Sequence, residues 1–114
     1  MYQKIIGRFG ENVAKQYLLT KSYKILATNW RYKKLEIDII AYQKTVIAIE
    51  VKTRKSLITP PQSILSRAQV GRLRVALKNY CLLNKLSYKS SRLDLIVITP
   101  KSKQSVCLKH YQDV

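Results

Sequence analysis

Two consecutive apolar runs, residues 35–42 and 45–53, constrain the fold of this 114-residue chain more than any other feature. Apolar side chains occupy consecutive positions in both runs, so both faces of each strand would need a cover. Strands with this pattern lie in the centre of a sheet that has helices on both faces. The two runs therefore predict the central strands of an α/β protein.

The remaining elements are predicted from the sequence on either side of these runs. Apolar residues recur at helical spacing over residues 8–22 and again over 64–86. Further strands are expected at 23–30, 93–99 and 104–109. Residues 56–63, which include two consecutive prolines, are expected to form a loop without regular structure. The predicted order is α-β-β-β-α-β-β in one domain covering residues 1–114.

The charge balance constrains the partners. The chain has 22 Lys and Arg against 6 Asp and Glu, which gives a net charge of +16. A charge of this size attracts polyanions, with a strong dependence on salt. Nucleic acid is the first candidate, and an anionic membrane surface or an acidic protein is the second. No apolar run is long enough to span a bilayer and the N-terminus lacks the apolar region of a signal peptide, so we expect a cytoplasmic protein.

Three of the six acidic residues, Glu36, Asp38 and Glu50, fall in the two central runs, and Lys52 follows the last of them. A three-residue hairpin loop at 43–45 would place Asp38 opposite Glu50, with Cβ atoms about 4.5–5.5 Å apart. A two-residue loop would place Asp38 on the wrong face, opposite an isoleucine. A site built from both carboxylates therefore requires an odd-numbered loop or a bulge.

Carboxylates at this distance repel each other unless a cation separates them or one holds a proton. Mg²⁺ or Mn²⁺ would resolve the conflict, because hard oxygen ligands suit such ions and the metal would activate a water near a phosphate. In this interpretation Asp38 and Glu50 hold the metal, the carbonyl of Val51 is a further ligand, Lys52 orients water or phosphate, and Glu36 is a supporting residue. The alternative is a surface hairpin whose glutamates pair with nearby lysines, and the apolar flanks argue against it.

Several ordered motifs resemble those of the bacterial YraN-type proteins, the UPF0102 family, over nearly the whole chain. The motifs are Gly10-Glu11-x-x-Ala14, the segment from Tyr23 to Arg31, Glu36-Ile37-Asp38-Ile39-Ile40-Ala41, Glu50-Val51-Lys52-Thr53-Arg54 and Arg92-Leu93-Asp94. That family is similar to the PD-(D/E)xK nucleases, which implies a restriction-endonuclease-like fold with a central mixed sheet flanked by helices. Archaeal Holliday-junction resolvases are close structural relatives.

The resemblance also implies roles for individual residues. Asp38 matches the first acid of the nuclease motif, Glu50 and Lys52 match its (D/E)xK, and Glu11 matches a glutamate of the first helix that assists metal binding. Two positions depart from the family pattern. Leu35 stands where a glycine is usual, and Gln69 stands where the long helix often has a lysine.

Basic residues outside the carboxylate cluster are candidates for nucleic-acid binding. They are Arg8, Arg54, Lys55, Arg67, Arg72, Arg74 and Lys78. Such contacts position the phosphate backbone and do not read sequence. For any one of these residues, a solvated surface position is the simpler interpretation, whereas the net charge favours binding for the group.

Four further residues are assigned structural roles. Cys81 and Cys107 stand in apolar contexts without a metal-type neighbour, so we expect small core residues. His110 has no partner nearby in the sequence and is expected to be structural. Asp94, beside Arg92, is explained by an ion pair or support of the fold as well as by a catalytic role.

The leading hypothesis from the sequence is a Mg²⁺-dependent endonuclease that acts on DNA, including branched or damaged DNA. A resolvase would need two active sites and hence a homodimer. One rival is a nucleic-acid-binding or interaction module that kept the nuclease fold without turnover. Another is a basic protein that associates with RNA or the ribosome and needs no metal.

Overall fold

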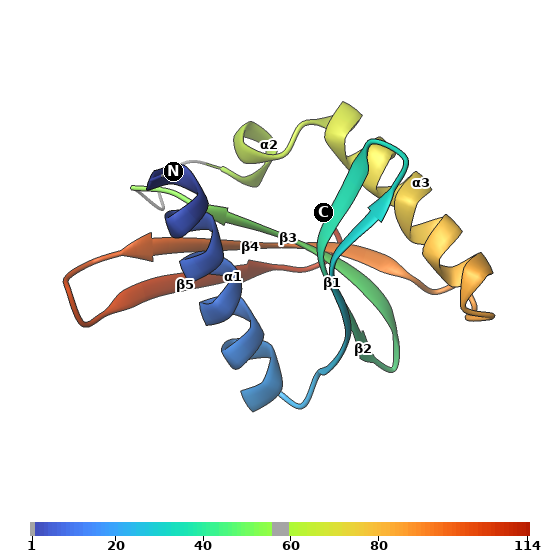
Figure 1. The fold of residues 1–114 in the computed structure, drawn as a ribbon, viewed down its shortest axis with the longest axis horizontal. Coiled ribbons are helices and arrows are strands. Elements are labelled where there is room, and N and C mark those ends of the chain that lie inside the picture. Colours follow the sequence, from blue (N-terminus) through green and yellow to red (C-terminus); the bar gives the residue numbers. More distant parts are fainter. Residues whose placement is uncertain (1, 56–59) are drawn as a thin grey trace.

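The computed structural model describes residues 2–55 and 60–114 (Figure 1). The elements in chain order are α1 (Tyr2–Thr20), β1 (Lys24–Tyr32), β2 (Leu35–Gln43), β3 (Thr45–Thr53), a short α2 (Pro61–Ile64), α3 (Arg67–Leu83), β4 (Arg92–Pro100) and β5 (Val106–Tyr111). Apart from the short α2, this is the predicted order. No helix in the described ranges is long and apolar enough to cross a membrane.

The strands form one five-stranded sheet in the order β1-β2-β3-β4-β5. Strands β3 and β4 are parallel, and every other neighbouring pair is antiparallel. The chain between β3 and β4 includes α2 and α3, which is the kind of long crossover that a parallel pair requires. The sheet is therefore mixed, and its one parallel pair includes the strand that carries Glu50 and Lys52.

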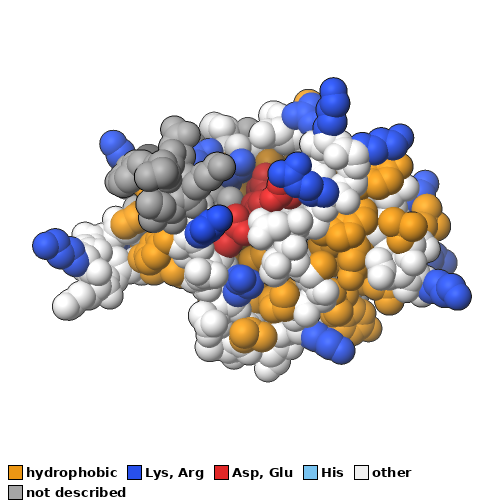
Figure 2. All heavy atoms as spheres, viewed as in Figure 1, with side chains coloured by type: hydrophobic (Ala, Val, Ile, Leu, Met, Phe, Trp, Pro, Cys, Tyr) orange, Lys and Arg blue, Asp and Glu red, His pale blue; other side chains and the backbone are white. Residues whose placement is uncertain are grey.

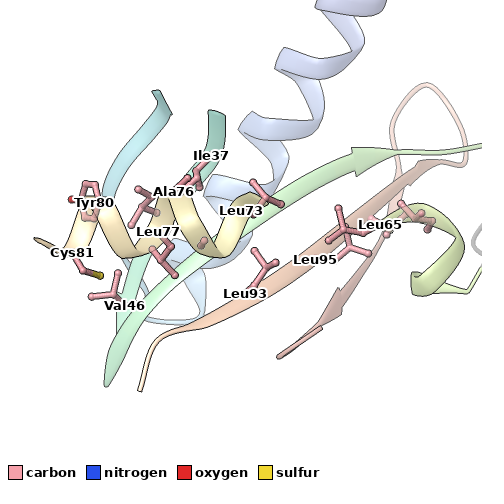
Figure 3. Close-up of a cluster of buried hydrophobic side chains, with 14 residues drawn as sticks. Ile37, Val46, Leu65, Leu73, Ala76, Leu77, Tyr80, Cys81, Leu93 and Leu95 are labelled. Carbon is pink, nitrogen blue, oxygen red and sulfur yellow. The ribbon is translucent and has the colours of Figure 1, made fainter. Parts of the chain in front are cut away.

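The core has one layer on each face of the sheet. On one face, α3 packs Leu73 and Leu77 against strand residues that include Ala48 and Leu93 (Figure 3). On the other face, Leu18 of α1 packs in a cluster with residues that include Ile49. Because β3 contributes alternate residues to both layers, its apolar positions are consecutive. This arrangement confirms the prediction of central strands covered on both sides.

The cysteines fit the same core. Cys81 is fully buried against the α3 layer, Cys107 is half-buried, and both are free thiols. The expectation of small core residues is confirmed for Cys81 and met in part for Cys107.

The start of α3 differs from the expected helix, which began at residue 64. Ser66 caps the helix: its Oγ accepts from the N–H of Gln69 at 3.2 Å, and Gln69 Oε1 accepts from the N–H of Ser66 at 2.9 Å. Gln69 therefore completes a capping box in place of the family's lysine. The expected irregular loop was wrong at residues 61–63, which belong to the helical turn Pro61–Ile64. Proline suits the first position of a helix, because the N–H that it lacks would have no partner within the helix. Residues 56–59 of that loop lie outside the described residues.

The β1–β2 hairpin bends near Asp38. Ile37 packs in the α3 layer and Ile39 in the α1 layer, although regular alternation along a strand would place both side chains on one face. The ladder pairs Trp30 with Ile37 and Thr28 with Ile39, and the residue between them on β1, Asn29, has φ 49°. A left-handed residue breaks the regular alternation of a strand.

Two glycines in helices predict opposite responses to alanine. A Cβ on Gly10 would lie 2.6 Å from Thr53 Oγ1, whereas a Cβ on Gly71 would meet nothing within 4 Å. We expect Gly10→Ala to lower the free energy of unfolding by about 1–3 kcal/mol, because α1 must move away from β3. Gly71→Ala should raise it by about 0.5–1 kcal/mol through helix propensity. Urea titrations of both variants measure the difference, and equal effects would contradict the close α1–β3 contact.

Candidate active site

The register of the β2–β3 hairpin places the two central carboxylates across from each other. Tyr42 pairs with Val46, and Ile39 pairs with Ile49, around a turn at Lys44. This is the odd-numbered loop that the site required. The same register continued by one residue sets Asp38 across from Glu50, just beyond the last paired residues.

A cleft of about 480 Å³ opens at this end of the hairpin. Its lining residues are Ile6, Gly7, Glu11, Asp38, Glu50, Val51, Lys52, Thr53 and Arg54. Helix α1 supplies the first three, and β2 and β3 with the residue after β3 supply the others. Figure 2 shows acidic side chains gathered in one place with Lys and Arg side chains around them. Every residue predicted to bind metal or act in catalysis therefore lines one cleft.

Asp38 and Glu50 form the centre of the cleft. The backbone N–H of Val51 donates to Asp38 Oδ2 at 2.9 Å. Burial, together with the hydrogen-bonding and charge of the Glu50 carboxyl, raises the pKa of Asp38 to about 8, although the Val51 N–H and the Lys52 charge oppose this. This raised pKa favours the protonated form of the Asp38 carboxyl when no cation is present.

Lys52 lies beside Glu50 on β3. Its Nζ is 3.4 Å from Glu50 Oε2, and the two side chains are 25% and 13% exposed, respectively. Glu36, the supporting residue expected from the sequence, pairs with Arg31 Nη2 at 3.1 Å and does not line the cleft. The alternative interpretation, in which the glutamates form ion pairs, is thus met in part: Glu50 pairs with Lys52 within the cleft, and Glu36 pairs with an arginine outside the cleft lining.

A second carboxylate pair adjoins the first. Asn29 Nδ2 donates to Glu11 Oε1 at 2.9 Å and to Glu36 Oε1 at 3.1 Å. Burial raises the pKa of Glu11; the charges of Asp38 and Glu36 add to this, while Asn29 and a lysine oppose it. Sequence reasoning missed Asn29. The sequence did carry a signal: asparagine is depleted in strands, and Asn29 lies inside the strand predicted at 23–30.

The donor set suits a hydrated Mg²⁺. Among residues 2–55 and 60–114, no group of three or more His, Cys, Asp or Glu side chains is gathered closely enough to hold a metal. The cleft instead offers Asp38, Glu50 and the Val51 carbonyl, with Glu11 on the same wall. Mg²⁺ keeps several waters and commonly uses one or two carboxylates. A cation here would also offset the charge of Glu50, which adds to burial in raising the pKa of Asp38.

The predicted nucleic-acid contacts fall into two groups. Arg54 lines the cleft, and the exposed Arg8 and Lys55 are next to cleft residues in the chain. The others lie on α3, outside the cleft lining: Arg67, Arg72, Arg74 and Lys78. Arg74 is half-buried and donates from Nη2 to the backbone carbonyl of Val114 at 3.2 Å, so part of its role is structural. Helix α3 packs on the other face of the sheet from α1 and is not joined to the cleft.

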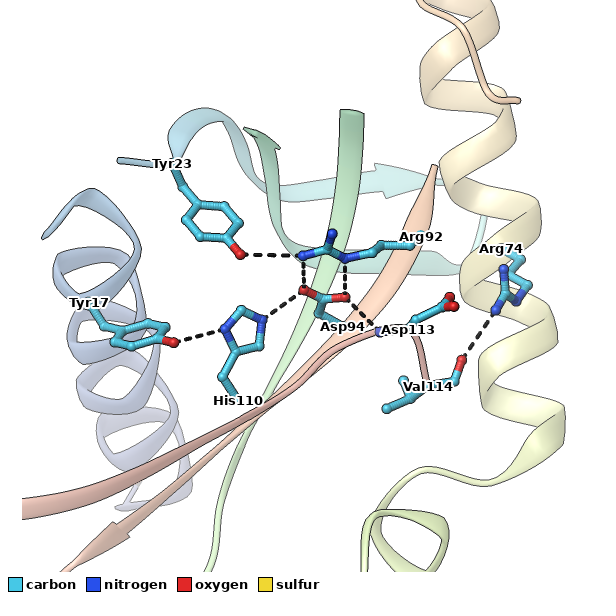
Figure 4. Close-up of polar contacts among 8 residues, drawn as sticks. All are labelled: Tyr17, Tyr23, Arg74, Arg92, Asp94, His110, Asp113 and Val114. Carbon is cyan, nitrogen blue, oxygen red and sulfur yellow. Dashed lines mark hydrogen bonds and ion pairs between the residues drawn. The ribbon is translucent and has the colours of Figure 1, made fainter. Parts of the chain in front are cut away.

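A buried polar network elsewhere contains Asp94, whose role the sequence left open, and His110, which was expected to be structural (Figure 4). Asp94 is 0% exposed and accepts from Arg92 Nε at 2.9 Å and from His110 Nε2 at 2.7 Å. The other His110 nitrogen, Nδ1, lies 2.9 Å from the Tyr17 hydroxyl. Burial alone would raise the pKa of Asp94, but the hydrogen bonds from His110, Arg92 and the Asp113 N–H outweigh it and lower the pKa. None of these side chains lines the acidic cleft, and they join α1 to β4, β5 and the C-terminal segment.

The fold and the cleft define a class of α/β protein with a mixed sheet between helices and a carboxylate-and-lysine cleft at one hairpin. Within this class the chain belongs to the UPF0102 family, because the model of that family, described as "Uncharacterised protein family UPF0102", matches residues 10–98. The family membership inferred from the ordered motifs is thereby confirmed.

Individual relatives match most of the chain. It is 36% identical over 110 residues to "UPF0102 protein FP2501" of Flavobacterium psychrophilum, covering 95% of this chain and 91% of that protein. It is 40% identical over 113 residues to a UPF0102 protein of Christiangramia forsetii, with 95% and 91% covered. It is 47% identical over 79 residues to a UPF0102 protein of Caldicellulosiruptor bescii, with 67% and 66% covered.

Proposed function

We propose that this protein is a cytoplasmic, Mg²⁺- or Mn²⁺-dependent endonuclease that hydrolyses phosphodiester bonds in DNA. One observation carries the proposal: Asp38, Glu50 and Lys52 line the same cleft, with Lys52 Nζ 3.4 Å from Glu50 Oε2 and the Val51 N–H donating to Asp38 Oδ2 at 2.9 Å. Carboxylates that only paired with surface lysines would have no reason to be half-buried beside each other.

The roles of the residues follow from their positions. Asp38 and Glu50 would hold the metal, the carbonyl of Val51, which lines the same cleft, would be a further ligand, and Glu11 would support the site from α1. When bound, Mg²⁺ supplies the charge that polarises a phosphate oxygen and lowers the pKa of a water. Lys52, 3.4 Å from Glu50 Oε2 in the metal-free protein, would donate to the attacking water or to a phosphate oxygen and offset the developing negative charge.

The charge of the chain supports a nucleic-acid substrate. A net charge of +16 favours association with phosphates, and the acidic residues of the cleft stand out against this basic background. Arg8, Arg54 and Lys55 are the basic residues closest in the chain to the cleft lining, so they are the first candidates for phosphate contacts. DNA is favoured over RNA by the likeness of the motifs to DNA nucleases. A homodimer is required if the substrate is a symmetric junction.

Cleavage of a labelled panel tests the proposal. The panel contains single strand, duplex, flap and four-way junction DNA, with matching RNA strands, each incubated with Mg²⁺, Mn²⁺ or chelator. We expect metal-dependent cleavage by the wild-type protein and a loss of about 100-fold or more in Asp38→Ala and in Lys52→Ala. Lys101→Ala, at an exposed lysine between β4 and β5, controls for the loss of one positive charge.

Binding without cleavage would favour a non-catalytic module. The observation behind this second candidate is the existing Lys52–Glu50 ion pair, which occupies both groups in the metal-free protein. Such a module should keep its DNA affinity in Asp38→Ala and in chelator. Tight binding to RNA alone, with no metal requirement, would indicate the RNA-associated alternative.

A further inference from the structure

Asn29 has a backbone conformation that is unusual for its place in the fold. It lies inside strand β1 with φ 49°. The other non-glycine residues with positive φ in the described ranges all lie in turns or just beyond an element: Ser22, Lys33, Lys44, Lys85 and Asp113. A left-handed residue within a strand is strained, and asparagine is among the few side chains that tolerate it.

The conformation places the Asn29 amide between two elements. One NH₂ group donates to Glu11 of α1 at 2.9 Å and to Glu36 of β2 at 3.1 Å. Glu36 is fixed further by Arg31, which contacts its other carboxylate oxygen at 3.1 Å. Glu11 in turn lines the cleft with Asp38 and Glu50. One side chain thus ties a cleft carboxylate on the helix to the bent part of the hairpin.

Stability alone does not account for this arrangement. The hydrogen bonds of Asn29 are exposed to solvent, so they add little to the free energy of folding. Strained backbone in such places is usually retained where it positions functional groups. The bend also lies across from Asp38, next to the cleft rather than at a distant turn.

We propose that Asn29 is a positioning residue of the metal site, which holds the Glu11 carboxylate at the cleft so that Glu11 can bind or support the cation beside Asp38 and Glu50. The inference rests on the proposed function in that it assumes a divalent cation in this cleft. It assigns Asn29 an effect on metal affinity that acts through Glu11 and requires no contact between Asn29 and the metal.

The test is a double-mutant cycle on Mn²⁺ affinity, measured by calorimetry without any nucleic acid. Asn29→Gly keeps a backbone suited to φ 49° and removes only the amide. We expect about tenfold weaker Mn²⁺ binding in Asn29→Gly, the size typical of a residue that orients a metal ligand. Glu11→Gln should show a similar or larger loss, and the double variant should be no weaker than Glu11→Gln alone. Lys85→Gly is the control: it also introduces glycine at a residue with positive φ, after α3, and should bind Mn²⁺ as the wild type does.

The outcomes separate this inference from the proposed function. Unchanged Mn²⁺ affinity in Asn29→Gly, or additive losses in the double variant, would overturn the role of Asn29 alone. Mn²⁺ binding with the expected cycle, but without cleavage of any nucleic acid, would support Asn29 and overturn the nuclease. A wild-type protein that binds no Mn²⁺ would overturn both. Urea midpoints measured beside the affinities identify a variant that has lost its fold, and in that case Asn29→Ser replaces Asn29→Gly in the cycle.

Discussion

Asp38→Asn is expected to unfold at higher urea concentration than the wild-type protein when both are free of metal at about pH 9, with a gain of several kcal/mol. The pKa of Asp38 is raised from 3.8 to about 8, first by burial and then by the Glu50 carboxyl. Above that pH the wild-type protein holds two neighbouring carboxylates without a cation between them. The amide of the variant carries no charge, and its oxygen can still accept from the Val51 N–H.

The sign of the pH dependence follows from the raised pKa. A carboxyl that binds its proton more tightly in the folded state makes the wild-type protein lose stability as the pH rises from about 4 to about 8. The advantage of Asp38→Asn should therefore be near zero at the acid end, grow across this interval and level off above it. Asp113→Asn makes the same exchange at an exposed carboxylate and should show no such growth. A stability advantage of Asp38→Asn that is constant with pH would contradict a raised pKa of Asp38 in the folded protein.

The same variant should lose Mn²⁺ binding, so stability and function would change in opposite directions. In the wild-type protein, binding at neutral pH should release close to one proton, because the cation replaces the proton on Asp38. Calorimetry in two buffers with different ionisation enthalpies measures this proton release. Metal binding without proton release would place the ion away from Asp38.

The parts of the fold that were predictable depend on neighbours in the sequence. Consecutive apolar positions indicated that β2 and β3 are covered on both faces, and the core layers at Ala48 and Ile49 confirm it. The hairpin register was predicted only on the condition that Asp38 and Glu50 share one site, and the paired residues meet this condition. Both inferences use spacing over a few residues, which a sequence records directly.

The parts that were missed depend on contacts between distant segments. His110 meets Tyr17 from the first helix and Asp94 from the neighbouring strand, and no local pattern links positions so far apart. The bend at Asn29 also escaped prediction, because alternation assumes a regular strand whereas the positive φ depends on the tertiary position of its amide. The helical turn at Pro61–Ile64 was missed for a simpler reason: two prolines indicate a break in a helix and also suit the start of one.

Loss of the Asp94 carboxylate should be the most destabilising single change in the buried network. Asp94 is fully buried and accepts from Arg92 at 2.9 and 3.1 Å, from His110 at 2.7 Å and from the Asp113 N–H at 3.0 Å. Asp94→Ala leaves the Arg92 guanidinium and the nearly buried His110 ring without their acceptor. Removing one partner of a buried charged pair typically costs about 3–5 kcal/mol, a large share of the stability of a domain this size.

The pH dependence of this loss should be opposite to that at Asp38. The network lowers the pKa of Asp94, so its contribution is fully present above the unfolded-state pKa of about 4 and fades as the pH falls below it. Urea titrations of the wild type and Asp94→Ala should therefore differ most at neutral pH and converge in acid. Asp113→Asn, which keeps the backbone N–H that donates to Asp94, should stay close to the wild type throughout. Because Asp94 lies outside the cleft, the folded fraction of Asp94→Ala should bind Mn²⁺ with wild-type affinity, whereas a loss of affinity in folded protein would mean that the network also shapes the site.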